Sequence, residues 1–306
     1  MKSLIGHTPI IKLNSGAKNI NLYAKCEFVN PTGSIKDRVA QYMIETLTKN
    51  NVLQPNQLIV EASSGNMGTS LAALSKVYDH PVHITCPEKT GGIKRKMIQK
   101  FGAKLTVCPS VTDATDPDFY VNKARKIAEE NEGYFVNQYD NTLNTECHYH
   151  TTGQEIVDYF TQQQIPLDYF ITVGGSGGTV TGCAKKIKEH FANAQVVMPD
   201  PFGSVYHDLF YHQKVIPENI KSYRVEGPGN SVFCQSMDLF MIDQIIQFSD
   251  EEAFAACDAL VHDHGVLVGH SSGANYHIAQ KLMAALAPDV PINMLILLPD
   301  SGVKYL

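Results

Sequence analysis

The stretch that decides the fold runs from Tyr169 to Phe191 and reads YFITVGGSGGTVTGCAKKIKEHF. It begins with an apolar run typical of a buried strand, and from Thr181 onward it has the spacing of an amphipathic helix. The turn between them, residues 174–179, contains four glycines, a serine and a threonine. A strand, a tight turn and a helix in this order predict one repeating unit of a parallel α/β sheet.

The same alternation of short apolar runs and helix-period stretches extends to both sides of this unit. Strands are expected at residues 58–60, 82–86, 105–107, 134–136, 266–268 and 294–298, and helices at 70–78, 94–101, 121–130, 152–160, 251–264 and 274–287. Residues 199–220 are the least periodic and are expected to form a surface loop. Helices that connect successive strands predict the α/β class, with mainly parallel sheets in three layers.

The composition is that of a soluble globular protein and argues against several classes of function. With 306 residues, 43% of them hydrophobic, the chain can form one large domain or two moderate ones. The 25 Lys and Arg against 31 Asp and Glu give a net charge of −6, which argues against nucleic-acid binding. No apolar run approaches the ~18–20 residues that span a membrane. Seven single cysteines, and no apolar signal segment in residues 1–9, predict a cytoplasmic protein.

The glycine turn at residues 174–179 has the chemistry of a phosphate site. Its backbone N–H groups can converge on an anion, and the helix behind it adds positive potential. It fits neither standard nucleotide pattern, because Val180 occupies the last glycine position of G-x-G-x-x-G and no Gly-Lys-Ser/Thr follows. The alternative is a plain strand-to-helix turn, but this turn has more glycines and hydroxyls than that requires. We therefore favour phosphate binding.

Two further polar turns have a functional and a structural interpretation each. Residues 61–68, EASSGNMG, offer hydroxyls and an amide to a carboxylate or phosphate, or simply cap the helix that follows. Residues 30–38, NPTGSIKDR, place Lys36 at the start of an apolar-periodic stretch. A partly desolvated lysine there can act as a nucleophile, and the alternative is a solvated surface lysine. The residues alone leave the turn at 61–68 open, and for Lys36 taken by itself they favour the solvated surface lysine.

Two other motifs are excluded on their spacing. Residues 269–273 spell G-x-S-x-G, but the last histidine is His277 and no acid lies between it and Ser271, so a hydrolase triad is rejected. The segment Cys147-His148-Tyr149-His150 does not match common zinc spacings and no second ligand pair follows. We predict no metal site.

Five motifs occur together in a fixed order, at residues 30–38, 63–68, 175–179, 269–273 and 298–301. With them, essentially the whole chain closely resembles the pyridoxal-phosphate β-replacement family, which includes O-acetylserine sulfhydrylase (cysteine synthase) and cystathionine β-synthase. The resemblance implies fold type II, tryptophan synthase β-like, with two three-layer αβα domains and the cofactor in the cleft between them. It implies a smaller, mobile domain at 37–138, a larger one at 1–36 plus 139–306, and a homodimer.

The resemblance also assigns roles to residues of this chain. Lys36 would carry the Schiff base to pyridoxal 5'-phosphate, Asn66 would bond the ring hydroxyl, and Ser271 would face the pyridine nitrogen. The phosphate would be held by Gly175, Ser176, Gly177, Gly178 and Thr179. The substrate carboxylate would be held at Ser63, Ser64 and Gln138, beside Met67. Ser63 and Met67 depart from the family's usual Thr-Ser-Gly-Asn-Thr-Gly.

The implied reaction is β-replacement on serine or an activated serine through an aminoacrylate, with an amino acid and a thiol as substrates. Residues 138–141, 200–204, 223–227 and 250–254 look more like cystathionine β-synthase, so we expect L-serine and L-homocysteine to give cystathionine. Tyr139 is the candidate proton donor for the leaving hydroxide; its alternative role is to line the site. The alternatives are O-acetylserine or O-phosphoserine giving cysteine, and an inactive binding relative.

Overall fold

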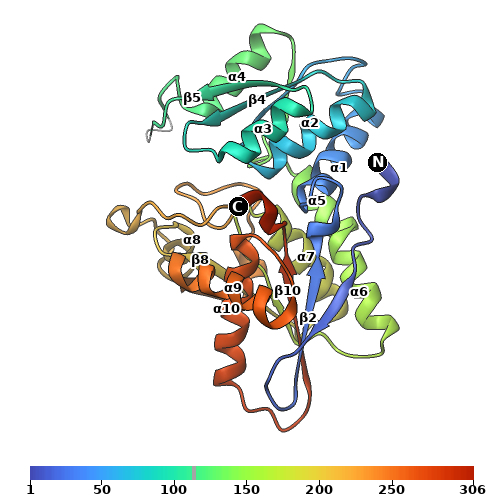
Figure 1. Ribbon diagram of the computed structural model, residues 1–306, viewed down its shortest axis with the longest axis vertical. Helices are drawn as coiled ribbons and strands as arrows, with labels where there is room; N and C mark the ends of the chain where they lie inside the picture. Colours follow the sequence, from blue (N-terminus) through green and yellow to red (C-terminus); the bar gives the residue numbers. More distant parts are fainter. Residues whose placement is uncertain (112–114) are drawn as a thin grey trace.

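The computed structural model describes residues 1–111 and 115–306, which form two sheets that lie one above the other in Figure 1. The lower sheet has the order β1-β2-β10-β7-β8-β9, and the upper one β5-β4-β3-β6. The strands of the lower sheet are β1 (Ile10–Leu13), β2 (Ile20–Cys26), β7 (Tyr169–Ile171), β8 (Gln195–Pro201), β9 (Gln244–Phe248) and β10 (Ile292–Leu298). Those of the upper sheet are β3 (Ile59–Ala62), β4 (Val82–Pro87), β5 (Lys104–Cys108) and β6 (Tyr134–Phe135).

Helices join most of these strands. The helices are α1 (Lys36–Lys49), α2 (Asn66–Tyr78), α3 (Gly92–Lys100), α4 (Tyr120–Glu130), α5 (Leu143–His150), α6 (Thr152–Gln162), α7 (Gly178–His190), α8 (Tyr206–His212), α9 (Asp250–His264) and α10 (His270–Ala285). The described residues also contain five short 3₁₀ turns: η1 (Lys2–Leu4), η2 (Glu27–Val29), η3 (Pro217–Asn219), η4 (Leu239–Met241) and η5 (Gly302–Tyr305).

All strand pairs are parallel except β1 with β2. Antiparallel neighbours can be joined by a short turn, whereas parallel neighbours need a crossover, which the helices provide. The predicted α/β class with mainly parallel sheets is therefore confirmed.

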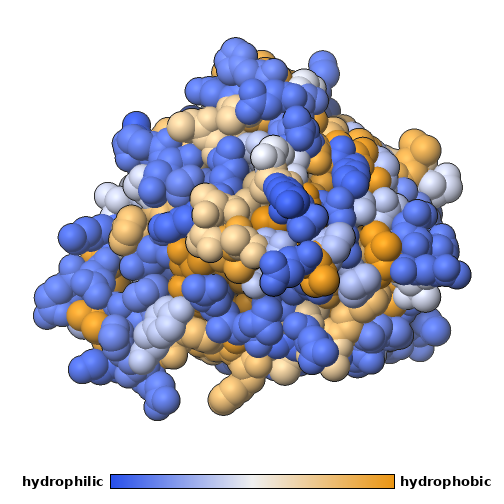
Figure 2. Space-filling view, turned by 90° about the horizontal axis from the view of Figure 1, so that it is seen from below, coloured by the Kyte–Doolittle hydropathy of each residue, from blue (hydrophilic) through white to orange (hydrophobic). Residues whose placement is uncertain are grey.

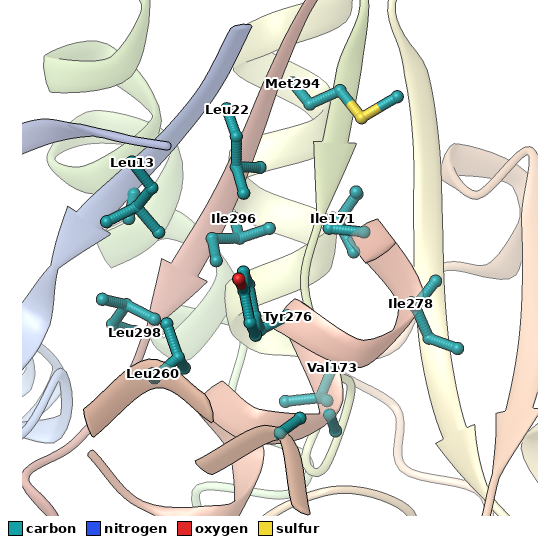
Figure 3. Packing of buried hydrophobic residues seen from close by; sticks show 14 of the residues in the cluster. Leu13, Leu22, Ile171, Val173, Leu260, Tyr276, Ile278, Met294, Ile296 and Leu298 are labelled. Atoms are coloured by element: carbon teal, nitrogen blue, oxygen red, sulfur yellow. The ribbon is translucent and has the colours of Figure 1, made fainter. Parts of the chain in front are cut away.

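The lower sheet is covered on both faces because its strand residues alternate between two apolar clusters. On β10, Met294 and Ile296 face one cluster, shown in Figure 3 with Tyr276 of α10, and Leu295 and Leu297 face the other. The second cluster contains residues of α6 and α7. A strand buried on both faces has a continuous apolar sequence, and this explains why residues 294–298 were recognised as a strand.

The upper sheet is covered in the same way. Ile59 of β3 lies in a cluster with residues of α1 and α2, and Val60 lies in another cluster with residues of α4. The outer face seen from below is mostly hydrophilic, with apolar residues in small groups (Figure 2). Among the described helices, none has the length and apolar character needed to cross a membrane.

Two of the sequence-based assignments are wrong. Residues 266–268 form no strand and make only the bridge between Val268 and Ser301, because both edges of β10 are already paired with β2 and β7. Residues 199–220 contain the end of β8, α8 and η3 instead of a surface loop. The side chains that α8 buries, Tyr206 and Asp208, include a polar one, so the apolar period is missing. The sequence also gave no signal for β1, β2, β8, β9 or α5.

The topology brings the predicted motifs to two sheet edges. The segment that leads to α1, the segment after β10 and the glycine turn leave the carboxyl ends of the adjacent parallel strands β2, β10 and β7. In the upper sheet, residues 63–68 and 136–139 leave the carboxyl ends of β3 and β6, which also pair. Ligands of α/β proteins bind at such edges. The C-terminal η5 lies beside α3, between the two sheets (Figure 1).

Candidate active site

Lys36 is the first residue of α1, and the segment that precedes it is hydrogen-bonded to the segment after β10. The amide of Ile35 donates to the carbonyl of Pro299 at 2.9 Å, and Ser301 donates back to Gly33 at 3.0 Å. Among the described residues, the Lys36 amine has neither a hydrogen bond nor an ion pair. Burial lowers its pKa to about 8, against the opposing effect of nearby groups such as Glu61. The Lys36 side chain is half-buried, so it is not the fully solvated lysine of the alternative, and at a pKa of about 8 part of the amine is neutral near neutral pH.

The glycine turn before α7 is shaped by close packing. Gly177 has a φ of +93°, and a Cβ there would lie 2.5 Å from the backbone of Met237. A Cβ on Gly175 would lie 2.2 Å from the carbonyl oxygen of Gly227. Packing thus accounts for these glycines. The amides of the first turn of α7 have no intrahelical acceptor, as at any helix start. A helix start of this kind attracts an anion.

The hydroxyls of this turn are held by α5. Ser176 lies 2.9 Å from the amide nitrogen of Asn144, and Thr179 lies 3.1 Å from Nε2 of His148. His148 is thus part of the wall of the turn. In the described parts of the chain, no three His, Cys, Asp or Glu side chains are grouped so as to hold a metal ion.

Ser271 lies in the first turn of α10, close to the same glycine turn. Its side chain is buried, and its hydroxyl has no hydrogen-bond partner within the described residues. Gly227 lies between the two turns. Its carbonyl oxygen would lie 2.2 Å from a Cβ on Gly175, and a Cβ on Gly227 itself would lie 3.8 Å from Cβ of Ser271. The backbone of Gly269 donates to the carbonyl of Asp300 at 3.0 Å, which ties this turn to the segment beside Lys36.

Asn66, the first residue of α2, is held by the C-terminal segment. Its amide nitrogen donates to Oδ2 of Asp300 at 2.8 Å, and its oxygen accepts from the ammonium of Lys304 at 2.7 Å. The hydroxyl of Tyr305 donates to the same carboxylate oxygen at 2.7 Å. These contacts join the upper sheet with its covering helices (the upper unit) to the lower sheet with its covering helices (the lower unit) at the site. The motif at 298–301 contained Asp300, but the sequence assigned no role to Asp300, Lys304 or Tyr305.

The four residues predicted at the substrate carboxylate have different surroundings. The hydroxyl oxygen of Ser63 accepts from the backbone amides of Gly65 and Gly68 at 3.2 and 2.9 Å, as expected if this turn caps the start of α2. The hydroxyl hydrogen of Ser63 remains available for donation to a substrate. Ser64 is exposed, and Met67 is buried in the core of the upper unit. The carbonyl of Gln138 accepts from Asn144 at 2.8 Å.

Tyr139 is half-buried and lies near two other acidic groups, Tyr120 and Glu61, that the sequence did not reveal. Its hydroxyl lies 3.1 Å from that of Tyr120, and burial raises the pKa of Tyr139 well above its usual value. Glu61, at the end of β3, is fully buried, and its Oε2 has no partner among the described residues. Burial raises the pKa of Glu61 to about 8, so this carboxyl is mostly protonated at neutral pH. The sequence predicted a role for Tyr139 but none for Tyr120, and the only sequence signal for Glu61 was its position at the start of the polar turn 61–68.

A separate cavity of about 810 Å³ is lined by residues of α5 and α7 and by residues 235–240, and it contains none of the predicted site residues. Of the predicted residues, Asn66 lies at a contact between the two sheet units.

Comparison with known proteins identifies the family of the chain. The family model described as pyridoxal-phosphate dependent enzyme matches residues 1–300. The chain is 35% identical to a cystathionine beta-synthase of Apis mellifera and 33% identical to one of Oryctolagus cuniculus, over 99% of this chain in both cases. It spans 59% and 54% of the length of these two relatives.

Two solved structures have the same fold over nearly the whole chain. An O-ureido-L-serine synthase has a TM-score of 0.90 at 27% identity, covering 99% of this chain and 92% of that one. The O-acetylserine dependent cystathionine beta-synthase of Helicobacter pylori has a TM-score of 0.89 at 29% identity, covering 100% and 96%. With the family model matched over almost all its residues, the chain belongs to the family of pyridoxal-phosphate dependent enzymes.

Proposed function

We propose that this protein catalyses β-replacement on a serine-type amino acid and that its product is cystathionine, formed from L-serine and L-homocysteine. Family membership confirms the cofactor predicted from the ordered motifs. The observation that carries the proposal is the meeting of three segments, which bear the unpaired Lys36 amine, the donor-rich glycine turn and the unpaired Ser271 hydroxyl. The names of the relatives support the choice of cystathionine.

The residues present fit pyridoxal phosphate. The glycine turn offers amides and hydroxyls to a phosphate, and the buried Ser271 hydroxyl is the kind of partner a pyridine nitrogen needs. Lys36 offers an amine whose pKa is lowered to about 8 by burial, as a lysine that bonds an aldehyde requires. When bound, the cofactor supplies an electron-withdrawing ring that stabilises negative charge at the substrate Cα.

Lys36 has a second task in the proposed reaction. Once the incoming amino acid has displaced its amine, Nζ is free to take the Cα proton as a general base. Its lowered pKa keeps a useful fraction of the amine neutral near neutral pH. The amine is later available to return this proton.

Ser271 is neutral, and this sets the electronic character of the site. A hydroxyl donates a hydrogen bond to the pyridine nitrogen without transferring a full proton, whereas a carboxylic acid would protonate it. With Ser271 as its partner, a bound cofactor would withdraw electrons less strongly, which would favour elimination of the β-substituent over other fates of the substrate.

The amino-acid carboxylate would be bound by the turn after β3. The free hydrogen of Ser63 and the exposed hydroxyl of Ser64 can donate to it, together with the side chain of Gln138 from the neighbouring strand end. Met67 packs into the core, so its effect would be the absence of the hydroxyl that the family usually has there.

The choice of leaving group rests on a proton donor. Hydroxide is a poor leaving group, so a site that uses serine must protonate it as it departs. Tyr139 and Tyr120 form a partly buried pair whose phenols stay protonated, because burial raises the pKa of both. We infer that Tyr139 gives this proton. A second candidate is an O-acetylserine-using enzyme, supported by the likeness to the O-acetylserine dependent cystathionine beta-synthase of Helicobacter pylori.

The domain division at 37–138, its mobility and a homodimer remain part of the proposal. The four-stranded sheet lies within 37–138 and the six-stranded one outside it, which supports the division. Sedimentation of the purified protein tests the dimer.

The decisive experiment is a substrate matrix. Serine, O-acetylserine and O-phosphoserine are each combined with homocysteine, sulfide and cysteine, and kcat/KM is compared, since this ratio measures discrimination. We expect serine with homocysteine to be preferred; a strong preference for O-acetylserine with sulfide would replace this product by cysteine. Borohydride should fix the cofactor to Lys36, and an unchanged adduct in Lys36→Ala would overturn the lysine assignment. A holoprotein inactive in every combination would favour the binding relative.

A further inference from the structure

Helix α5 contacts the glycine turn through two side chains one helical turn apart. Asn144 and His148 lie four residues apart, on one face of the helix, and both are fully buried. The helices α5 and α7 approach closely at two glycines of α7. A Cβ on Gly178 would lie 2.3 Å from the side chain of Asn144, and a Cβ on Gly182 would lie 2.8 Å from Cβ of His148. This contact fixes where the two polar side chains meet the turn.

The orientation of the Asn144 amide follows from a backbone carbonyl. The carbonyl oxygen of Gln138 lies 2.8 Å from Nδ2 and can only accept, so the nitrogen must face it. The same nitrogen lies 2.9 Å from Oγ of Ser176 and gives its second hydrogen to that oxygen. Ser176 therefore accepts from Asn144, and its own hydrogen remains to be donated elsewhere.

The tautomer of His148 follows in the same way from a buried hydroxyl. Thr152 is fully buried, and within the described residues its Oγ1 has one hydrogen-bond partner, Nδ1 of His148 at 3.0 Å. A buried hydroxyl hydrogen without an acceptor is costly, so Thr152 donates to Nδ1. The ring proton then lies on Nε2, which donates to Oγ1 of Thr179 at 3.1 Å. Thr179, like Ser176, keeps its own hydrogen.

A neutral ring is required for this chain of bonds. Protonation would make both ring nitrogens donors and would leave the hydrogen of Thr152 without an acceptor. The surroundings agree, because burial, with smaller effects from Lys36 and Arg38, lowers the pKa of His148 well below its usual value.

We propose that Asn144 and His148 are positioning residues that turn the hydroxyls of Ser176 and Thr179 into hydrogen-bond donors directed at the phosphate of the cofactor. The inference rests on the proposed function of the glycine turn and extends it to two residues outside that turn. A doubly ionised phosphate only accepts hydrogen bonds, so a turn in which every amide and hydroxyl donates is matched to it. An undirected hydroxyl could instead present its lone pairs to the anion.

The test compares two ligands that differ only in the phosphate. The affinities of apoenzyme for pyridoxal 5'-phosphate and for pyridoxal are measured by titration for the wild type, His148→Leu and Asn144→Leu. We expect each variant to bind pyridoxal phosphate about ten-fold more weakly, because a directed bond to a charged group is lost. Pyridoxal affinity should stay within about two-fold. Equal losses for both ligands would mean a merely structural role and would overturn the proposal.

The chain offers a matched control and a conservative variant. His150 is on the same helix, is exposed and makes no contact with the glycine turn, so His150→Leu should leave both affinities unchanged. His148→Gln retains an amide donor and should recover part of the phosphate-dependent affinity. A loss in His150→Leu equal to that in His148→Leu would contradict the assignment to His148.

A second measurement needs no cofactor, and its first part needs no substitution. The ¹⁵N chemical shifts of the His148 ring in the wild-type apoenzyme should show the neutral tautomer with its proton on Nε2, and in Thr152→Val this preference should weaken. A ring with its proton on Nδ1, or a charged ring at neutral pH, would overturn the proposal even if the leucine variants fail to fold. Failure of the proposed function is recognised separately, because the wild type would then bind no pyridoxal phosphate.

Discussion

Nζ of Lys94 lies 2.5 Å from Oε2 of Glu226, so that α3 of the upper unit is tied to the segment between β8 and β9 of the lower unit. The same ammonium lies 4.1 Å from the centre of the Tyr305 ring in η5. Together with the contacts of Asn66 to Asp300 and Lys304, this pair joins the two units over the candidate site. The site residues of one unit are therefore positioned by the other.

The first prediction concerns this connection. Lys94→Met keeps most of the apolar stem and removes the charge, so the units should separate more often while each keeps its own core. We expect limited proteolysis to become several-fold faster, and the free energy of unfolding to fall by only about 1 kcal/mol, because the carboxylate partner is partly exposed. Lys96→Met is the matched control, since Lys96 is exposed on the same helix. Equal proteolysis rates in the two variants would count against the connection.

The second prediction concerns acid stability. Burial alone would raise the pKa of Glu155, but its hydrogen bonds and charge pairing with Arg38, and its pairing with Lys25, lower it to about 2. A carboxyl whose folded pKa lies below its unfolded value of 4.5 contributes stability above pH 4.5 and loses it as the pH falls towards 2. The contribution is on the order of 3 kcal/mol. Urea unfolding at pH 5, 4 and 3 should therefore show a decline that is shallower in Glu155→Gln; an identical slope would contradict this.

The third prediction concerns the shape of the glycine turn. Gly177→Ala places a Cβ 2.5 Å from the backbone of Met237 at a φ of +93°, so both the turn and its donors must shift. We expect the loss of bound cofactor at micromolar concentration, seen in the visible spectrum. Gly92→Ala is the control, because a Cβ on Gly92, at the first position of α3, meets nothing within 4 Å. Full cofactor retention in Gly177→Ala would show that the turn can move without loss of binding.

The sequence predicted the strands that are buried on both faces and the motifs that lie next to them in the chain. Lys36 and Ser271 were found because each stands within a local motif. The partners of these motifs were missed because they are distant in sequence: Lys304 meets Asn66 across 238 positions. Their short polar segments carry no periodic signal, and only the fold brings them together.

The same reasoning explains the errors in the fold. Residues 266–268 are apolar and β-branched enough for a strand, and local preference cannot show that β10 already has a partner on each edge. Helix α5 was missed because its sequence, LNTECHYH, has almost no apolar stripe. Its buried face is made by Asn144, Cys147 and His148, two of which are polar. A helix that serves a polar site is thus hard to recognise from hydrophobic periodicity.

The fourth prediction concerns the pH dependence of cofactor capture. Only the neutral amine of Lys36 can bond the aldehyde, and burial lowers its pKa to about 8. The rate at which apoenzyme gains visible absorbance should rise about ten-fold per pH unit below pH 8 and level off above it. Stopped-flow mixing of apoenzyme with pyridoxal phosphate measures this, and Lys36→Ala, which has no amine, is the blank. A rate that still rises steeply above pH 9 would indicate an unshifted lysine.

The last prediction separates the two roles of Tyr139. If its phenol protonates the departing hydroxide, Tyr139→Phe should lower kcat/KM for serine by about 10²-fold, the lower end of general acid catalysis. The value for O-acetylserine should change little, because acetate leaves without such help. Tyr120→Phe removes the hydroxyl that lies 3.1 Å from that of Tyr139 and should lower kcat/KM for serine less. This variant controls for disturbed packing of the tyrosine pair. The ratio of the two substrates within each variant cancels differences in folding and cofactor content. An equal loss for both substrates would assign Tyr139 to the wall of the site, and the proton would then have to come from another group, of which Glu61, buried and mostly protonated, is the first to test.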